Sequence, residues 1–260
     1  MFEMVGQPAS GRVFRGERRV RLGDCSPGGR LRLDAVARYL QDVSDDDTRD
    51  AGLAQRTWVV RRTVIDVLRF PTYLEPLDMV TWCSGIGSRW AERRVDIEGA
   101  GGGSLSSATL WVHLDAESLR PRSLPVAFEE IYAGAADGRS VTSRLSLGGR
   151  LPDVAMAEWP MRFSDFDVMG HVNNAVALVV VEEMLATRRN LRAPLRVEVE
   201  YRSPIDRGVK LRWGTTGRDS ACDGWLVDGQ NQCHVAFRIG RPPQPGPIPG
   251  PHTSPHPDPS

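Results

Sequence analysis

Two stretches of this 260-residue chain follow one pattern, and this repetition limits the possible folds more than any other feature. Residues 20–43 and residues 161–184 align without a gap. The aligned stretches share an arginine, an aspartate and a glycine: Arg21 and Arg162, Asp24 and Asp165, Gly29 and Gly170. A helix-like run and then several runs of alternating apolar and polar residues follow each copy. The sequence therefore predicts two copies of one unit, each with a strand, a long helix and about four antiparallel strands.

Each copy contains one predicted helix. In the second copy, a nearly unbroken apolar run follows Asn174 and extends to Arg188 and Arg189, whose charges suit a helix C-terminus. The valines at 179–181 favour a strand by propensity, but the length of the run favours a helix, which Asn173 or Asn174 can cap. A helix that is apolar on nearly all sides must be wrapped by other elements, and a curved antiparallel sheet can do this.

The first-copy helix, at residues 33–43, is more amphipathic than the second. The acidic run at residues 44–47 follows it and is interpreted as a solvated helix end. Period-2 alternation predicts strands at residues 63–70, 79–82, 90–97, 107–114, 195–201, 209–213 and 233–239.

The chain is expected to divide into two units with a connection and a tail. We predict an N-terminal unit at residues 1–133, a linker rich in Gly, Ser and charge at 134–152, and a C-terminal unit at 153–240. Residues 241–260 are rich in proline and are predicted to be disordered.

Composition excludes several classes of function. Lys+Arg and Asp+Glu both number 33, so no overall attraction to nucleic acid or to an anionic membrane is expected. No apolar run reaches the ~20 residues that span a bilayer, and the N-terminus lacks the apolar core of a secretory signal, so we expect a cytoplasmic protein. The four cysteines show no CxxC spacing, which favours reduced structural thiols over a disulfide or a metal site.

Residues 163–174, FSDFDVMGHVNN, are the strongest candidate for a functional site, and we call them the reactive turn. They place Asp167, Gly170, His171 and Asn174 directly before the second apolar run. The first turn of a helix offers backbone N–H groups without intrahelical partners. From residue types alone, structural roles compete with catalysis, because an Asp can be a cap, a His is often a satisfied structural residue, and Asn pairs commonly hold turns.

Family landmarks accompany this turn in a fixed order: WVVRRTVIDVLRFPTYLEP from Trp58, TLWVHLDAESLRPRSLP from Thr109, and VEYRSP from Val199. With them, the chain resembles the acyl-ACP thioesterases of plant plastids and their bacterial relatives, from about Phe14 to Ile239. The resemblance implies an α+β tandem double hotdog fold, in which each half is a curved antiparallel sheet wrapped around a long central helix. It also implies hydrolysis of fatty acyl-ACP to free fatty acid and carrier thiol, in fatty acid biosynthesis. No cofactor or metal is expected, the acyl carrier protein is the expected partner, and a homodimer is compatible with the family.

The chain departs from the plant pattern at two places. The plant Asp-x-Asn-x-His triplet matches Asp167, Met169 and His171, so Met169 replaces the asparagine. Pro204 and Ile205 stand where the plant enzymes carry a Glu-Cys pair. The remaining set argues against a cysteine-centred mechanism and is closer to the aspartate-dependent chemistry of bacterial hotdog thioesterases.

The chemistry of thioester hydrolysis suggests roles within the reactive turn. Asp167 takes a proton from water or attacks the thioester directly, and backbone N–H groups from about Gly170 to Asn174, those of Gly170 and Val172 among them, hold the oxyanion. His171 orients water, binds the thioester or hydrogen-bonds Asp167. Asn174 orders water or the carboxylate, and Glu183, further along the helix, matches a recurring family acid.

The first copy carries Ser26, Arg30 and Leu33 at the positions of Asp167, His171 and Asn174. We therefore expect one active site per chain, with the first copy supplying structure and, by the resemblance, much of the acyl pocket.

Three other functions remain open: an acyl-CoA thioesterase, a hydratase or dehydratase of the same fold, and a non-catalytic acyl-binding module. A set of arginines near the second helix is a candidate docking surface for an acidic carrier: Arg188, Arg189, Arg192 and Arg196.

Overall fold

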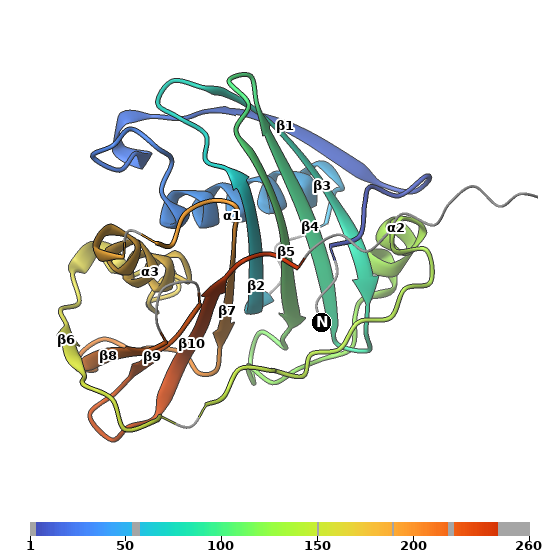
Figure 1. Ribbon diagram of the computed structural model, residues 1–260. Coiled ribbons are helices and arrows are strands. Elements are labelled where there is room, and N and C mark those ends of the chain that lie inside the picture. The colour runs from blue at the N-terminus through green and yellow to red at the C-terminus, as the bar shows by residue number, and fades with distance from the viewer. Residues whose placement is uncertain (1–3, 54–57, 150, 189, 218–220, 244–260) are drawn as a thin grey trace, which may run out of the picture.

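The computed structural model describes residues 4–53, 58–149, 151–188, 190–217 and 221–243, and these residues form one curved antiparallel sheet around two helices (Figure 1). The first half contains β1 (Val13–Arg19), α1 (Leu33–Asp50), β2 (Trp58–Arg69), β3 (Pro76–Ile86), β4 (Trp90–Gly99) and β5 (Ser104–His113), followed by α2 (Val126–Ala136). The second half contains β6 (Ala157–Trp159), α3 (Ala175–Thr187), β7 (Leu195–Tyr201), β8 (Leu211–Thr216), β9 (Cys222–Val227) and β10 (Cys233–Gly240). This is the predicted α+β double hotdog, with a strand, a helix and four strands in each half.

The two copies agree in backbone detail. A single 3₁₀ turn precedes the helix in each copy, at Leu22–Asp24 and at Phe163–Asp165. An isolated bridge follows in each, between Cys25 and Leu31 and between Phe166 and Val172. Gly29 and Gly170 both have φ 80°, in the left-handed region where glycine is favoured. The alignment made from sequence is therefore also the structural alignment of the two turns.

The halves share one sheet rather than two. Its strand order is β1-β3-β4-β5-β2-β7-β10-β9-β8-β6, so β2 of the first half pairs with β7 of the second. This antiparallel pairing runs from Arg62 opposite Glu200 to Val67 opposite Leu195. The junction is therefore held by backbone hydrogen bonds as well as by side chains.

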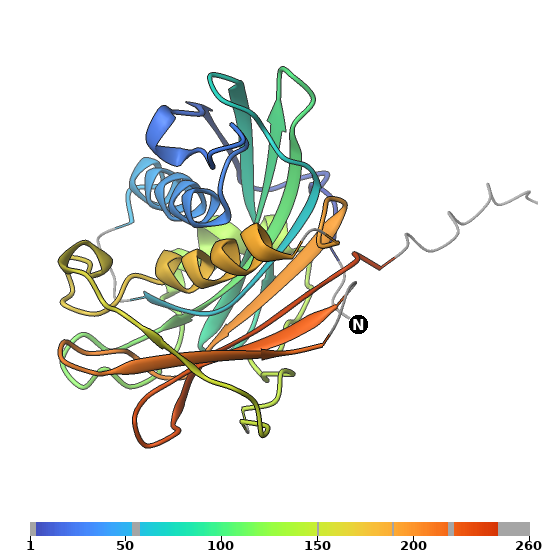
Figure 2. The ribbon, with the colours of Figure 1, turned by 60° about the vertical axis from the view of Figure 1, so that its left-hand side comes forward.

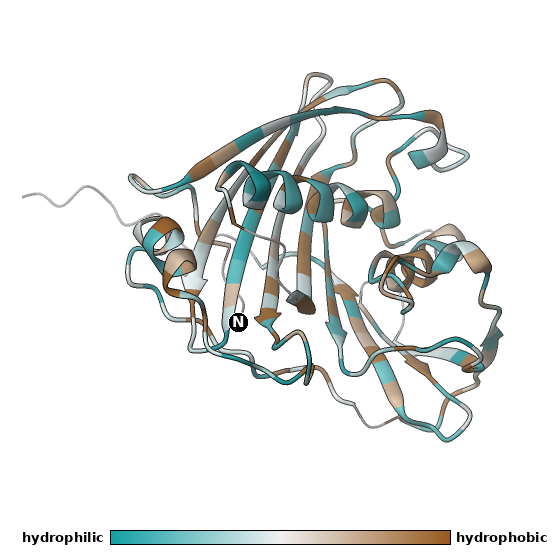
Figure 3. Cartoon of the chain, turned by 180° about the vertical axis from the view of Figure 1, so that it is seen from behind, coloured by the Kyte–Doolittle hydropathy of each residue, from teal (hydrophilic) through white to brown (hydrophobic). Residues whose placement is uncertain are grey.

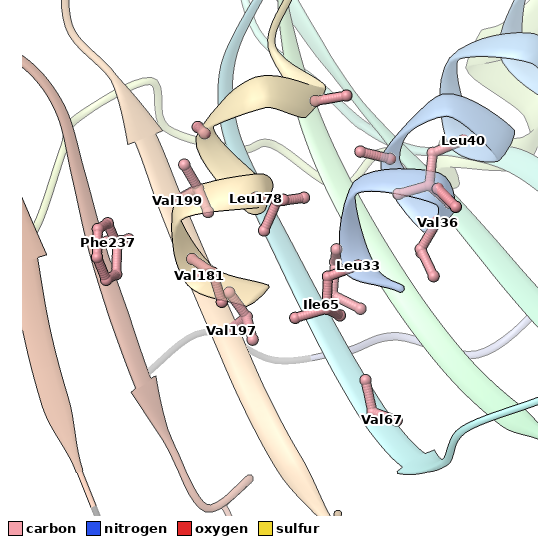
Figure 4. Packing of buried hydrophobic residues seen from close by; sticks show 14 of the residues in the cluster. Leu33, Val36, Leu40, Ile65, Val67, Leu178, Val181, Val197, Val199 and Phe237 are labelled. Atoms are coloured by element: carbon pink, nitrogen blue, oxygen red, sulfur yellow. The ribbon is translucent and has the colours of Figure 1, made fainter. Parts of the chain in front are cut away.

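The helices α1 and α3 lie side by side on the concave face of the sheet (Figure 2). Their apolar faces meet β2 and β7 in one core, where Leu33 and Leu178 pack near Ile65 and Val197 (Figure 4). Hydropathy colouring shows α3 largely apolar, whereas α1 is mixed (Figure 3). The predicted central helix after Asn174 is confirmed as α3. Most of its residues are buried, as expected for a helix that is apolar on nearly all sides.

The interpretation of residues 44–47 as a solvated helix end is wrong for Ser44 and Asp47, which are buried. The helix continues through them to Asp50, and Asp47 is only 1% exposed. Its carboxylate accepts hydrogen bonds from Arg12 at 2.7 Å, from Tyr132 at 2.8 Å, and from Arg93. These partners lie far from Asp47 in the sequence, so the local acidic run gave no sign of them.

Two elements had no sequence prediction. Helix α2 covers Val126–Ala136 and so extends into the segment assigned to the linker, and β9 covers Cys222–Val227. Residues 244–260 of the proline-rich tail lie outside the described residues. Among the described residues, no helix combines the length and apolarity needed to cross a membrane.

Candidate active site

Backbone hydrogen bonds fix the shape of the reactive turn. The Asp167 N–H donates to the His171 carbonyl at 2.9 Å, and the Gly170 N–H donates to the Asp167 carbonyl at 3.0 Å. The Asn173 N–H donates to the Asp165 carbonyl at 2.9 Å, which ties the turn to the start of α3. The side chains of Asp167 and His171 are therefore held by a hydrogen-bonded backbone turn that directly precedes the buried helix α3.

The Asp167 carboxylate is partly exposed and only partly engaged. Its Oδ1 accepts a hydrogen bond from the Met169 N–H at 2.9 Å, which holds the side chain in one orientation. Its Oδ2 accepts no hydrogen bond from any described residue. One carboxylate oxygen is thus free to meet water or a substrate carbonyl.

His171 is oriented by Asp206, a residue that sequence reasoning missed. Its Nδ1 lies 2.9 Å from Asp206 Oδ1, and within the described chain it makes no hydrogen bond with Asp167. Asp206 follows β7, two residues after Pro204. With the Nδ1 proton directed at this carboxylate, Nε2 of the neutral ring is an acceptor that can orient water.

Several backbone N–H groups before and at the start of α3 already donate hydrogen bonds within the protein. The N–H groups of Gly170 and Val172 already donate, to Asp167 and to the Ile205 carbonyl (3.1 Å) respectively. The Ala175 N–H donates to Asn173 Oδ1 at 2.8 Å, so Asn173 rather than Asn174 caps the helix by its side chain. In the described part of the chain, the N–H groups of His171 and Asn174 have no acceptor.

The other two candidate residues occupy different places. The Asn174 carbonyl accepts a hydrogen bond from the Tyr201 hydroxyl at 3.0 Å, which anchors the helix start to β7. Glu183 is exposed and lies about 13 Å along α3 from Asn174, so the structure does not bring it to the reactive turn. Its neighbour Glu182 is buried instead.

A cavity of about 360 Å³ adjoins the reactive turn. Val168 and Met169 of the turn line it, and the rest of its lining comes from the first half. Its walls include the following side chains from α1, the strands and α2: Gln41, Thr48, Trp58, Ala91, Trp111 and Phe128. Met169, at the position of the plant asparagine, therefore contributes an apolar surface between turn and cavity.

No cysteine stands in the reactive turn. All four cysteines are free, and burial raises the pKa of both Cys83 and Cys233 to about 11. A thiol with such a pKa holds almost no thiolate at neutral pH. No group of three or more metal-ligating side chains is found among the described residues.

Comparison with known proteins gives the same family across the chain. The model of the acyl-ACP thioesterase N-terminal domain matches residues 11–133, and that of the acyl-ACP thioesterase C-terminal domain matches residues 150–239. An uncharacterized protein of Mycobacterium tuberculosis is 33% identical over 210 residues, which are 80% of this chain and 84% of that protein. The chloroplastic palmitoyl-acyl carrier protein thioesterase of Arabidopsis thaliana is 23% identical, over 88% of this chain and 61% of that protein.

Solved structures agree on the fold. The 12:0-ACP thioesterase of Umbellularia californica superposes with a TM-score of 0.69 at 21% identity, covering 88% of this chain and 96% of that chain. An acyl-ACP thioesterase of Bacteroides thetaiotaomicron gives a TM-score of 0.68 at 15% identity, covering 87% and 96%. With both domain models matched in order over the duplicated hotdog halves, this chain belongs to the acyl-ACP thioesterase family.

Proposed function

We propose that the protein hydrolyses fatty acyl thioesters carried by acyl carrier protein, with Asp167 as the central catalytic group. The observation that carries this proposal is that Val168 and Met169, the two residues after Asp167, line a cavity in the other half of the molecule. A thioester that places its acyl chain in the cavity brings its carbonyl to the reactive turn. Family membership supports the reaction class.

The reaction needs an attacking group and a site for the developing oxyanion. The free oxygen of Asp167 either removes a proton from a water that attacks the carbonyl carbon, or attacks that carbon itself to form a mixed anhydride that water then hydrolyses. The C–S bond breaks, and the carrier thiol leaves with a proton. The His171 and Asn174 N–H groups supply donors for the oxyanion, and His171 Nε2 orients the water.

The cavity accounts for binding of the acyl chain. Each buried methylene stabilises the complex by ~0.8 kcal/mol, so the length of cavity available to the chain sets which chain is bound best. The first half thereby binds the substrate, although its own turn carries Ser26, Arg30 and Leu33 in place of the reactive set.

Acyl carrier protein is proposed as the carrier because of the family, not because of the arginines near α3. Arg196 forms an ion pair with Asp66 at 2.6 Å, and Arg188 donates to Thr215 at 2.8 Å. Arg192 is exposed, and Arg189 lies outside the described residues. The expected basic surface is thus partly committed within the protein. We propose a role in fatty acid biosynthesis on the same family grounds.

Release of free thiol tests the proposal. Purified protein is mixed with short, medium and long acyl groups, each carried once by acyl carrier protein and once by CoA. We expect thiol release, faster from the acyl carrier protein, and loss of at least ~10²-fold in rate for Asp167→Asn. If neither carrier yields thiol at any chain length, hydrolysis is wrong, and binding without turnover would instead support an acyl-binding module.

A further inference from the structure

An anion already occupies the start of α1 in the first half. The Leu33 N–H donates to Glu182 Oε1 at 2.6 Å, and Glu182 comes from α3 of the other half. The same carboxylate pairs with both terminal nitrogens of Arg30, at 2.9 and 2.7 Å. Glu182 is buried, so this is a desolvated contact at a helix N-terminus, where negative charge is stabilised. The backbone position of Leu33 therefore holds an anion in this fold.

The matching position in the second half has no such occupant. Asn174 aligns with Leu33, and its N–H has no acceptor among the described residues. Gln41 aligns with Glu182, and from α1 its Nε2 lies 3.4 Å from Oδ1 of Asn173, the residue before Asn174. Gln41 also lines the cavity beside Val168 and Met169. A neutral amide thus stands where the first half has a carboxylate.

We propose that Gln41 is a catalytic residue supplied by the first half, which donates a hydrogen bond from its side-chain amide to the thioester carbonyl oxygen together with the Asn174 N–H. This inference rests on the proposed function. The substrate oxyanion then occupies, at α3, the position that the Glu182 carboxylate occupies at α1. Amide side chains of Asn and Gln are established oxyanion donors in other enzymes.

The charge of the residue at position 41 decides whether the Asn174 N–H is available to a substrate oxyanion. A carboxylate there would accept the Asn174 N–H, as Glu182 accepts that of Leu33, and would repel the developing oxyanion. The first half balances its buried carboxylate with Arg30, whereas the matching His171 is paired with Asp206. The Gln41 contact to Asn173 is long, so the amide can turn to a substrate at little cost.

Two substitutions at Gln41 and two ligands test the proposal. Gln41→Ala is expected to lower kcat/KM by ~10²- to 10³-fold, the usual loss for one oxyanion donor. A trifluoromethyl ketone analogue of the acyl pantetheine, which mimics the tetrahedral intermediate, should lose affinity by a similar factor, while a thioether analogue without the carbonyl should bind unchanged. Gln41→Glu should lower the rate further. Wild-type rates in Gln41→Glu, or equal losses for both ligands, would overturn the proposal.

Asp42→Asn is the matched control, because Asp42 is an exposed neighbour on α1 that pairs with Arg18. It should leave both rate and ligand binding unchanged. A crystal structure of Gln41→Glu gives a readout that does not depend on hydrolysis: the new carboxylate should accept the Asn174 N–H. If the wild type releases no thiol while this contact is seen, the proposed function fails and the placement of Gln41 stands. A carboxylate turned away from α3 would refute the placement itself.

Discussion

The two turns share a backbone pattern and differ in the side chains that they present. Their backbones share the same 3₁₀ turn, the same bridge and the same left-handed glycine. Where the second copy presents Asp167 and His171, the first presents Ser26 and Arg30. Because the scaffold is shared, we propose that the difference in chemistry lies in these few positions and in the residues that face them from the other half.

His171 and Asp206 allow a graded prediction. Both side chains are substantially exposed, 44% and 68%, so Asp206 orients the ring through a solvent-screened contact that is weak in energy. His171→Ala should therefore lower kcat/KM by more than ten-fold, and Asp206→Asn by clearly less, in steady-state thiol-release assays. Equal losses in the two variants would contradict a merely orienting role for Asp206.

The sequence predicted the turn but not its partners. Asp167 and His171 stand in a recognisable motif, whereas Asp206 lies in a loop after β7 and meets His171 only in the folded chain. Gln41 and Glu182 do not belong to a recognisable sequence motif either. The alignment of the two copies does pair Gln41 with Glu182. In a duplicated fold, each of these helix residues faces the turn of the other copy, and this relation is the sequence signal that could have identified them.

Helix α1 illustrates a local pattern overruled by tertiary contacts. Its acidic end looks solvated in sequence, yet Asp47 points into the protein, where Arg12 and Arg93 converge on it. Its neighbours Asp45 and Asp46 do remain exposed. Helix α2, whose Tyr132 completes this cluster, had no sequence prediction. Periodicity found the long central elements because burial imposes it on them, and it could not identify ion pairs between distant segments.

Asp47 offers a stability test. Asp47→Ala leaves the Arg12 and Arg93 guanidinium groups without this buried acceptor, so the free energy of unfolding should fall by about 3–5 kcal/mol. Asp46→Ala, at an exposed neighbouring position, should change it by less than ~0.5 kcal/mol. Urea unfolding measures both. A change below ~1 kcal/mol for Asp47→Ala would show that the cluster does not stabilise the fold.

In the molecule as a whole, we propose that the two halves contribute different parts of one site. The first half builds most of the cavity, the second presents the reactive turn, and the β2–β7 pairing fixes one against the other. The family resemblance predicts the same division. The sequence did not reveal the volume of the cavity, because that volume depends on how side chains from α1, α2 and the strands pack together.

Filling the cavity should change chain-length preference without removing activity. Ala91 of β4 lines the cavity, and Ala91→Phe places a ring in part of its volume. We expect turnover of long acyl groups to fall at least ten-fold relative to short ones, measured as the ratio of kcat/KM values on one carrier. An unchanged ratio in a folded variant would mean that the acyl chain binds elsewhere.

We propose that only one of the two equivalent turns performs hydrolysis, and a pair of alanine substitutions distinguishes them. Asp167→Ala and Ser26→Ala alter matching positions on nearly identical backbones. Thiol release from the best acyl substrate is measured for both variants beside the wild type. We predict that Asp167→Ala loses at least ~10²-fold in rate and that Ser26→Ala retains the wild-type rate. Full activity in Asp167→Ala, or equal losses in the two variants, would contradict the claim.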